Sequence, residues 1–178
     1  MTAPPGVMVH PAGLCESTSV GAGTRIWAFA HVLEGAVIGS DCNVGDGAFV
    51  EDGARLGDRV TVKNNVLVWR GVTVEDDVFL GPAVTFTNDL RPRAHHRCRP
   101  DELVETTVQR GATIGANATV VCGVTIGADA FVAAGAVVVG DVPANALVAG
   151  NPARQRGLGL SVRRTGGRRP SMLEVHLR

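Results

Sequence analysis

A repeat of six residues constrains this chain of 178 residues more than any other feature. Large aliphatic or aromatic side chains stand at every sixth position from Met8 to Phe86, which makes fourteen consecutive positions without a slip. A small or β-branched residue stands two places before most of them, as Ala30 does before Val32. A period of six fits neither an amphipathic helix nor a plain alternating strand. It fits short strands that point residues two apart inward and are joined by tight turns.

The repeat is interrupted once and then resumes. It restarts at Val108 and continues to Val138 with six further positions, but Val108 follows Phe86 by 22 residues, which is not a multiple of six. We therefore expect an inserted loop over residues 87–107, where Pro, His and Arg break the pattern. Three units close one triangular coil, so the twenty units predict an all-β, parallel β-helix of six to seven coils.

Composition agrees with such a prism and excludes several other classes. Aromatic residues are only 4% of the chain, so the core must consist of Val, Ile, Ala and Leu. No apolar window of about 18 residues is present to span a membrane, and the N-terminus lacks the basic and apolar regions of a signal peptide. The four cysteines form no CxxC pair, which favours reduced thiols in a cytoplasmic protein over a disulfide frame or a zinc site.

Charge divides the chain into two parts. The net charge is zero, so we expect no bulk attraction to nucleic acid. Residues 154–178 nevertheless hold seven Arg against one acid, Glu174, and no aromatic residue that could stack on bases. We expect a repeat domain over 7–153, which contains the inserted loop, and a short basic C-terminal extension over 154–178.

The repeat blocks 111–117 (GATIGAN) and 123–127 (GVTIG) resemble the hexapeptide-repeat acyltransferases. The resemblance covers roughly residues 7–157. It implies a left-handed β-helix that works as a homotrimer, with acetyl-CoA as co-substrate and with no metal.

Three further segments resemble a narrower branch, the N-acetyltransferases of nucleotide-linked amino sugars. They are 25–32 (RIWAFAHV), 86–93 (FTNDLRPR) and 142–154 (VPANALVAGNPAR). The resemblance implies an acceptor that is a 3-amino hexose linked to dTDP or UDP, and the run 89–93 leans toward the dTDP-3-amino-3,6-dideoxyhexose enzymes. The sequence leaves the sugar and the nucleotide open.

Asn88 departs from many family members, which place a His there as general base. An amide cannot take up a proton. A hydroxyl nucleophile needs a base in the transition state, whereas a neutral amine needs positioning more than deprotonation. We therefore interpret Asn88 as the catalytic residue that orients an amine, while the thiolate of CoA accepts the surplus proton. The alternatives are a turn-forming Asn, or His95 or His96 as the base.

The inserted loop and one early coil supply the candidate residues for acceptor binding. Arg91 and Arg93 carry guanidinium forks that match phosphate oxygens, with Asp89 beside them; the alternative is a solvated basic loop. Residues 18 apart should stack in columns, which brings Glu34 and His31 into the candidate site. One predicted column consists of Glu34, Asp52, Arg70 and Asn88. The column beside it consists of His31, Phe49, Leu67 and Thr85. The alternative for both is a column of surface side chains that satisfy one another and bind no ligand.

The family resemblance implies a second set of residues, which would bind coenzyme A. The pantetheine arm would lie along backbone groups of Ala116 and Ala134, whose small side chains allow close approach; simple core packing is the alternative. Val139 and Gly140 stand where the family often has Thr-Lys, so a lysine for phosphate is missing. Arg154 matches a family Arg near the nucleotide, and the nearby Arg156 is a substitute for the lost charge.

Two enzymatic alternatives and one non-catalytic alternative compete with this interpretation. An O-acetyltransferase of a small hydroxylated acceptor is the first. A γ-class carbonic anhydrase would need three His ligands for zinc, and the histidines do not stand at matching places on stacked coils. A pure β-helix scaffold would have no need of a polar, Arg-rich loop beside Asn88.

Overall fold

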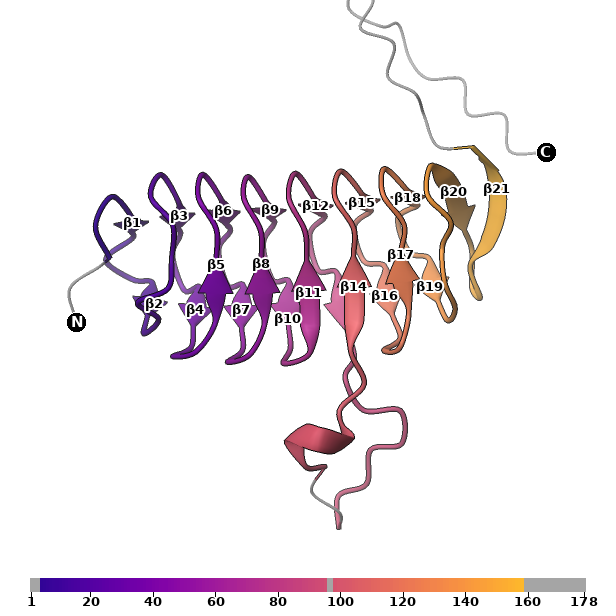
Figure 1. Ribbon diagram of the computed structural model, residues 1–178, viewed down its shortest axis with the longest axis horizontal. Helices are drawn as coiled ribbons and strands as arrows, with labels where there is room; N and C mark the ends of the chain where they lie inside the picture. The colour runs from indigo at the N-terminus through magenta and orange to yellow at the C-terminus, as the bar shows by residue number, and fades with distance from the viewer. Residues whose placement is uncertain (1–3, 96–97, 159–178) are drawn as a thin grey trace, which may run out of the picture.

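The computed structural model describes residues 4–95 and 98–158 as a left-handed parallel β-helix. The coils stack along one axis into a triangular prism from which one loop projects (Figure 1). Three sheets form the sides of the prism, because successive short strands of each coil join different sheets.

Successive coils contribute strands to the three sheets in the following spatial order. Sheet A contains β1 (Met8–Val9), β3 (Arg25–Ile26), β6 (Asn43–Val44), β9 (Thr61–Val62), β12 (Phe79–Leu80), β15 (Thr113–Ile114), β18 (Phe131–Val132), β20 (Ala146–Ala149) and β21 (Arg154–Leu158). Sheet B contains β19 (Val137–Val138), β16 (Thr119–Val120), β13 (Thr85–Phe86), β10 (Leu67–Val68), β7 (Phe49–Val50), β4 (His31–Val32) and β2 (Leu14–Cys15). Sheet C contains β17 (Thr125–Ile126), β14 (Thr106–Val108), β11 (Val72–Val74), β8 (Arg55–Leu56) and β5 (Val37–Ile38).

Side chains at the repeat positions fill the interior of the prism. From Val20 to Phe86, and again from Val108 to Val138, every repeat residue is buried, and Val20 is the most exposed of them at 8%. From Ile26 on, the residues two places before each repeat residue, such as Ala30, are buried as well. The described core therefore consists of small and aliphatic side chains, with Phe86 as its one buried aromatic residue.

The predicted phase of the repeat is wrong in its first two units. Val9 pairs with Ile26, and Cys15 pairs with Val32, so Val9 and Cys15 take the inward places. Met8 and Leu14 instead remain 37% and 46% exposed. The chain loses one residue between Cys15 and Val20, where five residues rather than six separate successive inward positions. The pattern alone could not show this, because both members of each pair are apolar or weakly polar.

The helix has about eight turns, where six to seven were predicted. Two further inward positions follow Val138: Val142 bridges to Ile126 in sheet C, and Val148 pairs with Val132 in sheet A. They were missed because Val142 comes four residues after Val138 instead of six. Strand β21 then runs back antiparallel to β20 and closes this end of sheet A.

Three edges join the sheets, and each takes its name from the two sheets that it connects. The A–B edge carries Ala116 and Ala134, the B–C edge carries Asn88, and the C–A edge carries Asp77. Turns on these edges place one residue at positive φ, for example Asn65 at 58° and Asp77 at 59°. Asn, Asp and Gly tolerate this conformation best, which explains their recurrence at the turns.

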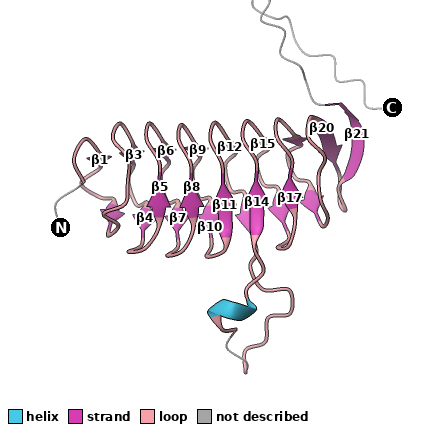
Figure 2. Ribbon diagram, in the orientation of Figure 1, coloured by secondary structure: helices cyan, strands magenta, loops and turns pink. Residues whose placement is uncertain are grey.

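The inserted loop replaces the turn between β13 in sheet B and β14 in sheet C. The backbone N–H of Val104 donates to the carbonyl oxygen of Asn88 at 3.0 Å, so the loop closes at a narrow neck. Its short 3-10 helix, η1 (Pro100–Glu102), is the one helix drawn in Figure 2. No helix in the described part of the chain is long and apolar enough to cross a membrane.

Candidate active site

The predicted column on the B–C edge is present, and Arg70 connects its members. The Arg70 guanidinium forms an ion pair with the carboxylate of Asp52, one coil earlier. The backbone N–H of Arg70 donates to Glu51 Oε2 at 2.8 Å. The carbonyl oxygen of Arg70 accepts a hydrogen bond of 3.4 Å from Nδ2 of Asn88, one coil later. Asn88 therefore stands on a row of contacts that runs across three coils.

His31 and Glu34 lie on the same side of the prism but three coils before Asn88. The pairing of His31 with Phe49 confirms the second predicted column. Three coils correspond to about 14 Å, so neither side chain adjoins Asn88 within one chain. The His31 ring packs edge-on against Phe49 with 5.6 Å between centroids. Its Nε2 lies 3.3 Å from Glu16 Oε1, but the orientation makes no hydrogen bond, and this buried atom finds no other hydrogen-bond partner within residues 4–95 and 98–158.

The loop places three predicted residues directly after Asn88. Asp89 folds back, and its Oδ1 accepts a hydrogen bond of 2.7 Å from the backbone N–H of Arg91. Arg91 and Arg93 are exposed, and none of the carboxylates in the described ranges pairs with either guanidinium. By contrast, Arg99 in the same loop lies 3.3 Å from an oxygen of each of its two acidic neighbours, Asp101 and Glu102.

The two loop histidines are the rival candidates for a general base. His95 is exposed, and His96 lies outside the described residues. Among the residues that are described, no group of three His, Cys, Asp or Glu side chains is arranged to hold a metal ion.

The loop also contains a cysteine, which raises the question of a covalent acyl intermediate. Burial raises the pKa of the Cys98 thiol, and the carboxylates of Asp89 and Glu102 raise it further. The thiolate is the nucleophilic form of cysteine. Cys98 therefore stays protonated near neutral pH, which favours direct transfer of the acyl group over an acyl-cysteine.

The predicted cofactor residues Ala116 and Ala134 stack on the A–B edge, one coil apart. The backbone N–H of Gly135 donates to the carbonyl oxygen of Ala116 at 2.9 Å. A Cβ atom on Gly115 would lie 2.5 Å from the amide nitrogen of Ala134, so only glycine allows these coils to approach so closely. Ala134 is exposed, and no described residue accepts a hydrogen bond from its amide or from that of Ala116.

Val139, Gly140 and Arg154 lie together at the C-terminal end of the prism. All three line a hollow of ≈ 330 Å³ whose floor includes Val142 and Val148. Arg154 begins β21, and its guanidinium donates to the carbonyl oxygen of Ala153 at 2.9 Å. The structure thus groups these three residues. Strand β19 separates them from the A–B edge that carries Ala134.

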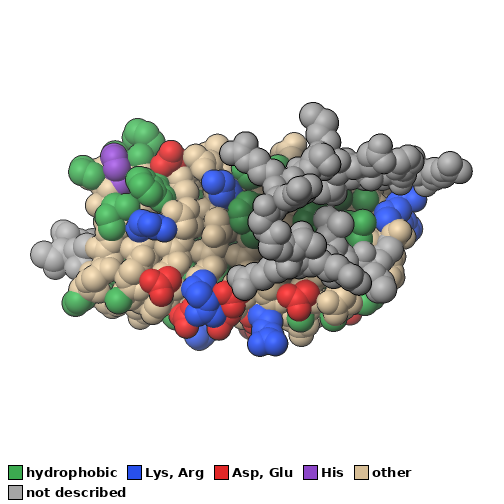
Figure 3. All heavy atoms as spheres, turned by 90° about the horizontal axis from the view of Figure 1, so that it is seen from above, with side chains coloured by type: hydrophobic (Ala, Val, Ile, Leu, Met, Phe, Trp, Pro, Cys, Tyr) green, Lys and Arg blue, Asp and Glu red, His purple; other side chains and the backbone are tan. Residues whose placement is uncertain are grey.

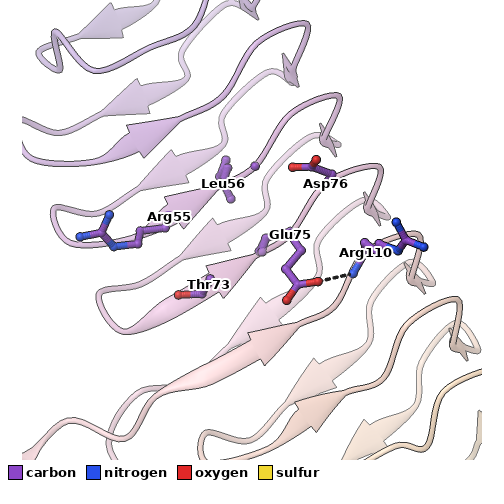
Figure 4. A pocket seen from close by; sticks show the side chains of 8 residues that line it. Arg55, Leu56, Thr73, Glu75, Asp76 and Arg110 are labelled. Carbon is purple, nitrogen blue, oxygen red and sulfur yellow. Dashed lines mark hydrogen bonds between the residues drawn. The ribbon is translucent and has the colours of Figure 1, made fainter.

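A larger hollow lies on the outer face of sheet C, and none of the predicted site residues lines it. Its volume is ≈ 410 Å³, and Arg55, Thr73, Glu75 and Arg110 border it (Figure 4). Glu75 Oε2 accepts the backbone N–H of Arg110 at 2.9 Å. The hollow is a groove between coils whose charges of both signs belong to neighbouring turns, so we place no chemistry in it.

The C–A edge holds a cluster of paired charges. Arg59 Nε lies 2.6 Å from Asp77 Oδ1, and Asp58 and Asp76 lie within 4 Å of the same guanidinium. Seen from above, acidic and basic side chains gather along the lower edge of the view, over the middle part of the prism's length (Figure 3).

Sequence reasoning missed the residues that follow each inward position on sheet B. Glu51 and Trp69 stand there, and both support the column: Glu51 binds the Arg70 amide, and Trp69 packs against Phe49 with 5.5 Å between ring centroids. The signal was available, because stacking residues 18 apart also aligns Glu51 with Trp69.

The comparisons with known proteins agree with this architecture. The family model for the bacterial transferase hexapeptide (six repeats) matches residues 17–52 and 105–140, and that for the hexapeptide repeat of succinyl-transferase matches 35–70. A dTDP-3-amino-3,6-dideoxy-α-D-galactopyranose 3-N-acetyltransferase from Aneurinibacillus thermoaerophilus is 52% identical over 149 residues, which cover 84% of this chain and 77% of that relative.

Two solved structures share the fold. A hexapeptide-repeat acetyltransferase from Vibrio cholerae, solved with acetyl-CoA, has a TM-score of 0.56 and 31% identity over 66% of this chain and 68% of its own. An N-acyltransferase from Bacillus cereus, solved with dTDP and coenzyme A, has a TM-score of 0.51 and 15% identity over 89% and 84% of the two chains, which shows likeness of fold alone. With its repeat, its inserted loop and its 52% identity to a sugar N-acetyltransferase, the chain belongs to the hexapeptide-repeat acyltransferases, in the branch of the sugar N-acetyltransferases.

Proposed function

We propose that this enzyme transfers the acetyl group of acetyl-CoA to the amino group of a 3-amino hexose linked to dTDP or UDP. The observation that carries the proposal is an amide, Asn88, in place of a base at the foot of the inserted loop. The relative that is 52% identical acts on a dTDP-linked 3-amino sugar, which favours dTDP over UDP.

The chemistry needs no protein base. The neutral amine attacks the thioester carbonyl, a C–N bond forms, and the tetrahedral intermediate expels the thiolate of CoA as the C–S bond breaks. The proton lost by the nitrogen passes to that thiolate, so charge and atoms balance. Asn88 cannot accept the proton, and its role is to hold the amine in the geometry of attack.

The loop supplies the groups for the nucleotide. We assign the diphosphate to Arg91 and Arg93, because their guanidinium forks match phosphate oxygens and lack a carboxylate partner among the described residues. Asp89 shapes the start of the loop by binding the Arg91 amide. His31 and Glu34 lie about 14 Å away along the prism, so they can meet only the far end of an extended acceptor.

Coenzyme A is assigned to the A–B edge and the C-terminal hollow. The free amides of Ala116 and Ala134, one coil apart, suit the amide groups of a pantetheine arm lying along the prism. Val139 and Gly140 border the hollow that Arg154 also lines, where Arg154 supplies positive charge toward the nucleotide end. Arg156, two residues later in β21, is exposed and is assigned as a further positive charge near that end.

These two sets of residues lie on different edges of one prism, which supports a homotrimer with sites shared between copies. Sheet B separates the edges, and its outward side chains are mostly apolar: Leu14, Leu33, Phe49, Leu67, Trp69, Val121, Val137 and Val139. Apolar side chains on the outer face of a sheet are typical of protein interfaces. A neighbouring copy on this face would bring the A–B edge of one chain toward the B–C edge of another.

We place the enzyme in the cytoplasm, since its four cysteines are free thiols. The proposal assigns it no nucleic-acid or membrane partner.

The test is acetyl transfer to a panel of dTDP- and UDP-linked sugars, followed by release of free CoA thiol. Turnover with 3-amino sugars and none with the matched 3-hydroxy sugars supports the proposal. Turnover with hydroxy sugars alone would identify an O-acetyltransferase instead. A folded protein that releases no thiol with any acceptor would favour a scaffold.

A further inference from the structure

The orientation of the Asn88 amide follows from its contact with Arg70. A carboxamide has one group that only donates, Nδ2, and one atom that only accepts, Oδ1. The neighbour at 3.4 Å is the carbonyl oxygen of Arg70, which only accepts. Nδ2 must therefore face Arg70, and Oδ1 points away. No described residue donates a hydrogen bond to Oδ1.

Two contacts hold Arg70, whose carbonyl oxygen meets Asn88, in place. The Arg70 N–H is held by Glu51 Oε2 at 2.8 Å, and the guanidinium is paired with Asp52. Gly53, at φ +75°, leaves room for the Arg70 stem, because a Cβ atom there would lie 3.2 Å from Arg70 Cγ. These contacts tie the turn that bears Arg70 to the preceding coil.

We propose that Arg70, held by Asp52 and Glu51, is a positioning residue that turns Asn88 Oδ1 toward the amine of the acceptor. The proposal rests on the proposed function and adds a physical cause for the selectivity of the enzyme for an amine over a hydroxyl acceptor. An amine can donate one N–H to Oδ1 and still direct its lone pair at the thioester. A hydroxyl would donate its only proton to an oxygen that cannot remove it, so its oxygen would stay a weak nucleophile.

A double-mutant cycle between Asp52 and Asn88 tests this indirect action, because an action through Arg70 predicts coupled effects. In the wild-type background, we expect Asp52→Asn to lower kcat about tenfold and to leave the KM for acetyl-CoA unchanged. In the Asn88→Ala background, the same substitution should lower kcat by less than about twofold. The matched control is Asp77→Asn, which removes an ion pair on the C–A edge and should leave kcat unchanged in both backgrounds. Thermal melting of each variant shows that it is folded.

The pH profile of Asn88→Asp gives a second readout that a purely structural role would not move. Near neutral pH the new carboxylate cannot donate to the Arg70 carbonyl, so activity should be lost as fully as in Asn88→Ala. As the pH falls, the protonated carboxyl can donate its O–H, so the activity ratio of variant to wild type should rise. A ratio that is flat or that rises with pH would overturn the proposal.

The outcomes separate the two proposals. A wild-type enzyme with no turnover on any amino sugar overturns the proposed function and, with it, the role of Arg70. An active wild type whose Asp52 and Asn88 effects simply add overturns the positioning role alone. Coupled effects together with a ratio that rises as the pH falls support both.

Discussion

The C–A and B–C edges of the prism are built from the same six-residue unit, yet they treat charge in opposite ways. On the C–A edge, Arg59 is satisfied by Asp77 and two further aspartates. On the B–C edge, Arg70 is satisfied, but the loop beyond it presents Arg91 and Arg93 without carboxylate partners in the described chain. Charges paired within the chain stabilise coils, whereas charges left unpaired beside an oriented amide are available to a ligand.

The backbone amides at the turns differ in the same way. On the C–A edge, the amides of Ser40 and Asp58 donate to the carboxylates of the next coil, at 2.7 and 2.8 Å. On the A–B edge, Ala116 and Ala134 offer no side chain that could play this part, and their own amides remain free among the described residues. Replacing aspartate with alanine thus leaves backbone amides unpaired along an edge, which is the property that the proposed coenzyme A site requires.

The largest effect on turnover should come from Asn88. We expect Asn88→Ala to lower kcat by about 10- to 1000-fold, because the amine loses its positioning group. His95→Ala and His96→Ala should each cost less than about tenfold. Steady-state kinetics with the amino sugar decide the matter. If either histidine variant were inactive while Asn88→Ala stayed active, the loop histidine would be the base.

The next largest effect should be on cofactor affinity. Ala134 is exposed, so Ala134→Glu should fold normally and raise the KM for acetyl-CoA sharply by blocking approach to the backbone. The matched control is Ala136→Glu, two residues later, where the side chain is 0% exposed and an unpaired buried charge should prevent folding. Melting temperature and KM are measured together. Normal acetyl-CoA affinity in a folded Ala134→Glu would remove this edge from the cofactor site.

A smaller change in substrate affinity should distinguish the unpaired arginines from the paired one. Arg91→Ala or Arg93→Ala should raise the KM for the nucleotide sugar about tenfold, which is the loss of one charge-assisted hydrogen bond. Arg59→Ala, on the C–A edge, should leave that KM unchanged. Equal effects of all three substitutions would mean that the loop arginines do not grip the diphosphate.

The fold was predictable because one period specifies it. An inward side chain every sixth residue leaves a chain few alternatives to a triangular coil, and burial from Val20 to Val138 follows from it. The phase of the repeat in its first two units was not predictable, because Val9 and Cys15 are as suitable for the interior as Met8 and Leu14. A strict period of six also does not predict Val142 as an inward residue, because Val142 follows Val138 by four residues.

The geometry of the candidate site was predictable only in part. The spacing of 18 residues placed Arg70 one coil before Asn88 in the same column. The contact between them uses the backbone carbonyl of Arg70, which no side-chain pattern reveals. The same arithmetic assigned His31 and Glu34 to the correct side of the prism without weighing the distance of about 14 Å that three coils impose. Sharing an edge is a property of sequence spacing, whereas adjacency also depends on how many coils intervene.

The smallest expected effect concerns acid stability, and it isolates the C–A edge from the site. The hydrogen bond from Arg59 lowers the pKa of the Asp77 carboxyl below its ordinary value of 3.8. Because the folded chain holds this carboxylate charged to lower pH than the unfolded chain does, the pair stabilises the fold above that value. Its contribution disappears as the pH falls through the lowered pKa.

Asp77→Asn should therefore reduce the melting temperature slightly at neutral pH and not at all once the wild-type carboxyl is protonated. The reduction should be small, since both side chains are about half exposed and solvent screens the pair. Melting curves of the two proteins between about pH 7 and pH 2 should converge at the acid end. Asn tolerates the φ of 59° as well as Asp does, so the substitution leaves the turn backbone unstrained. Curves that stayed equally far apart throughout would therefore show that Asp77 does not act through its charge, and the distinction between the charge-paired C–A edge and the proposed ligand-binding edges would need another basis.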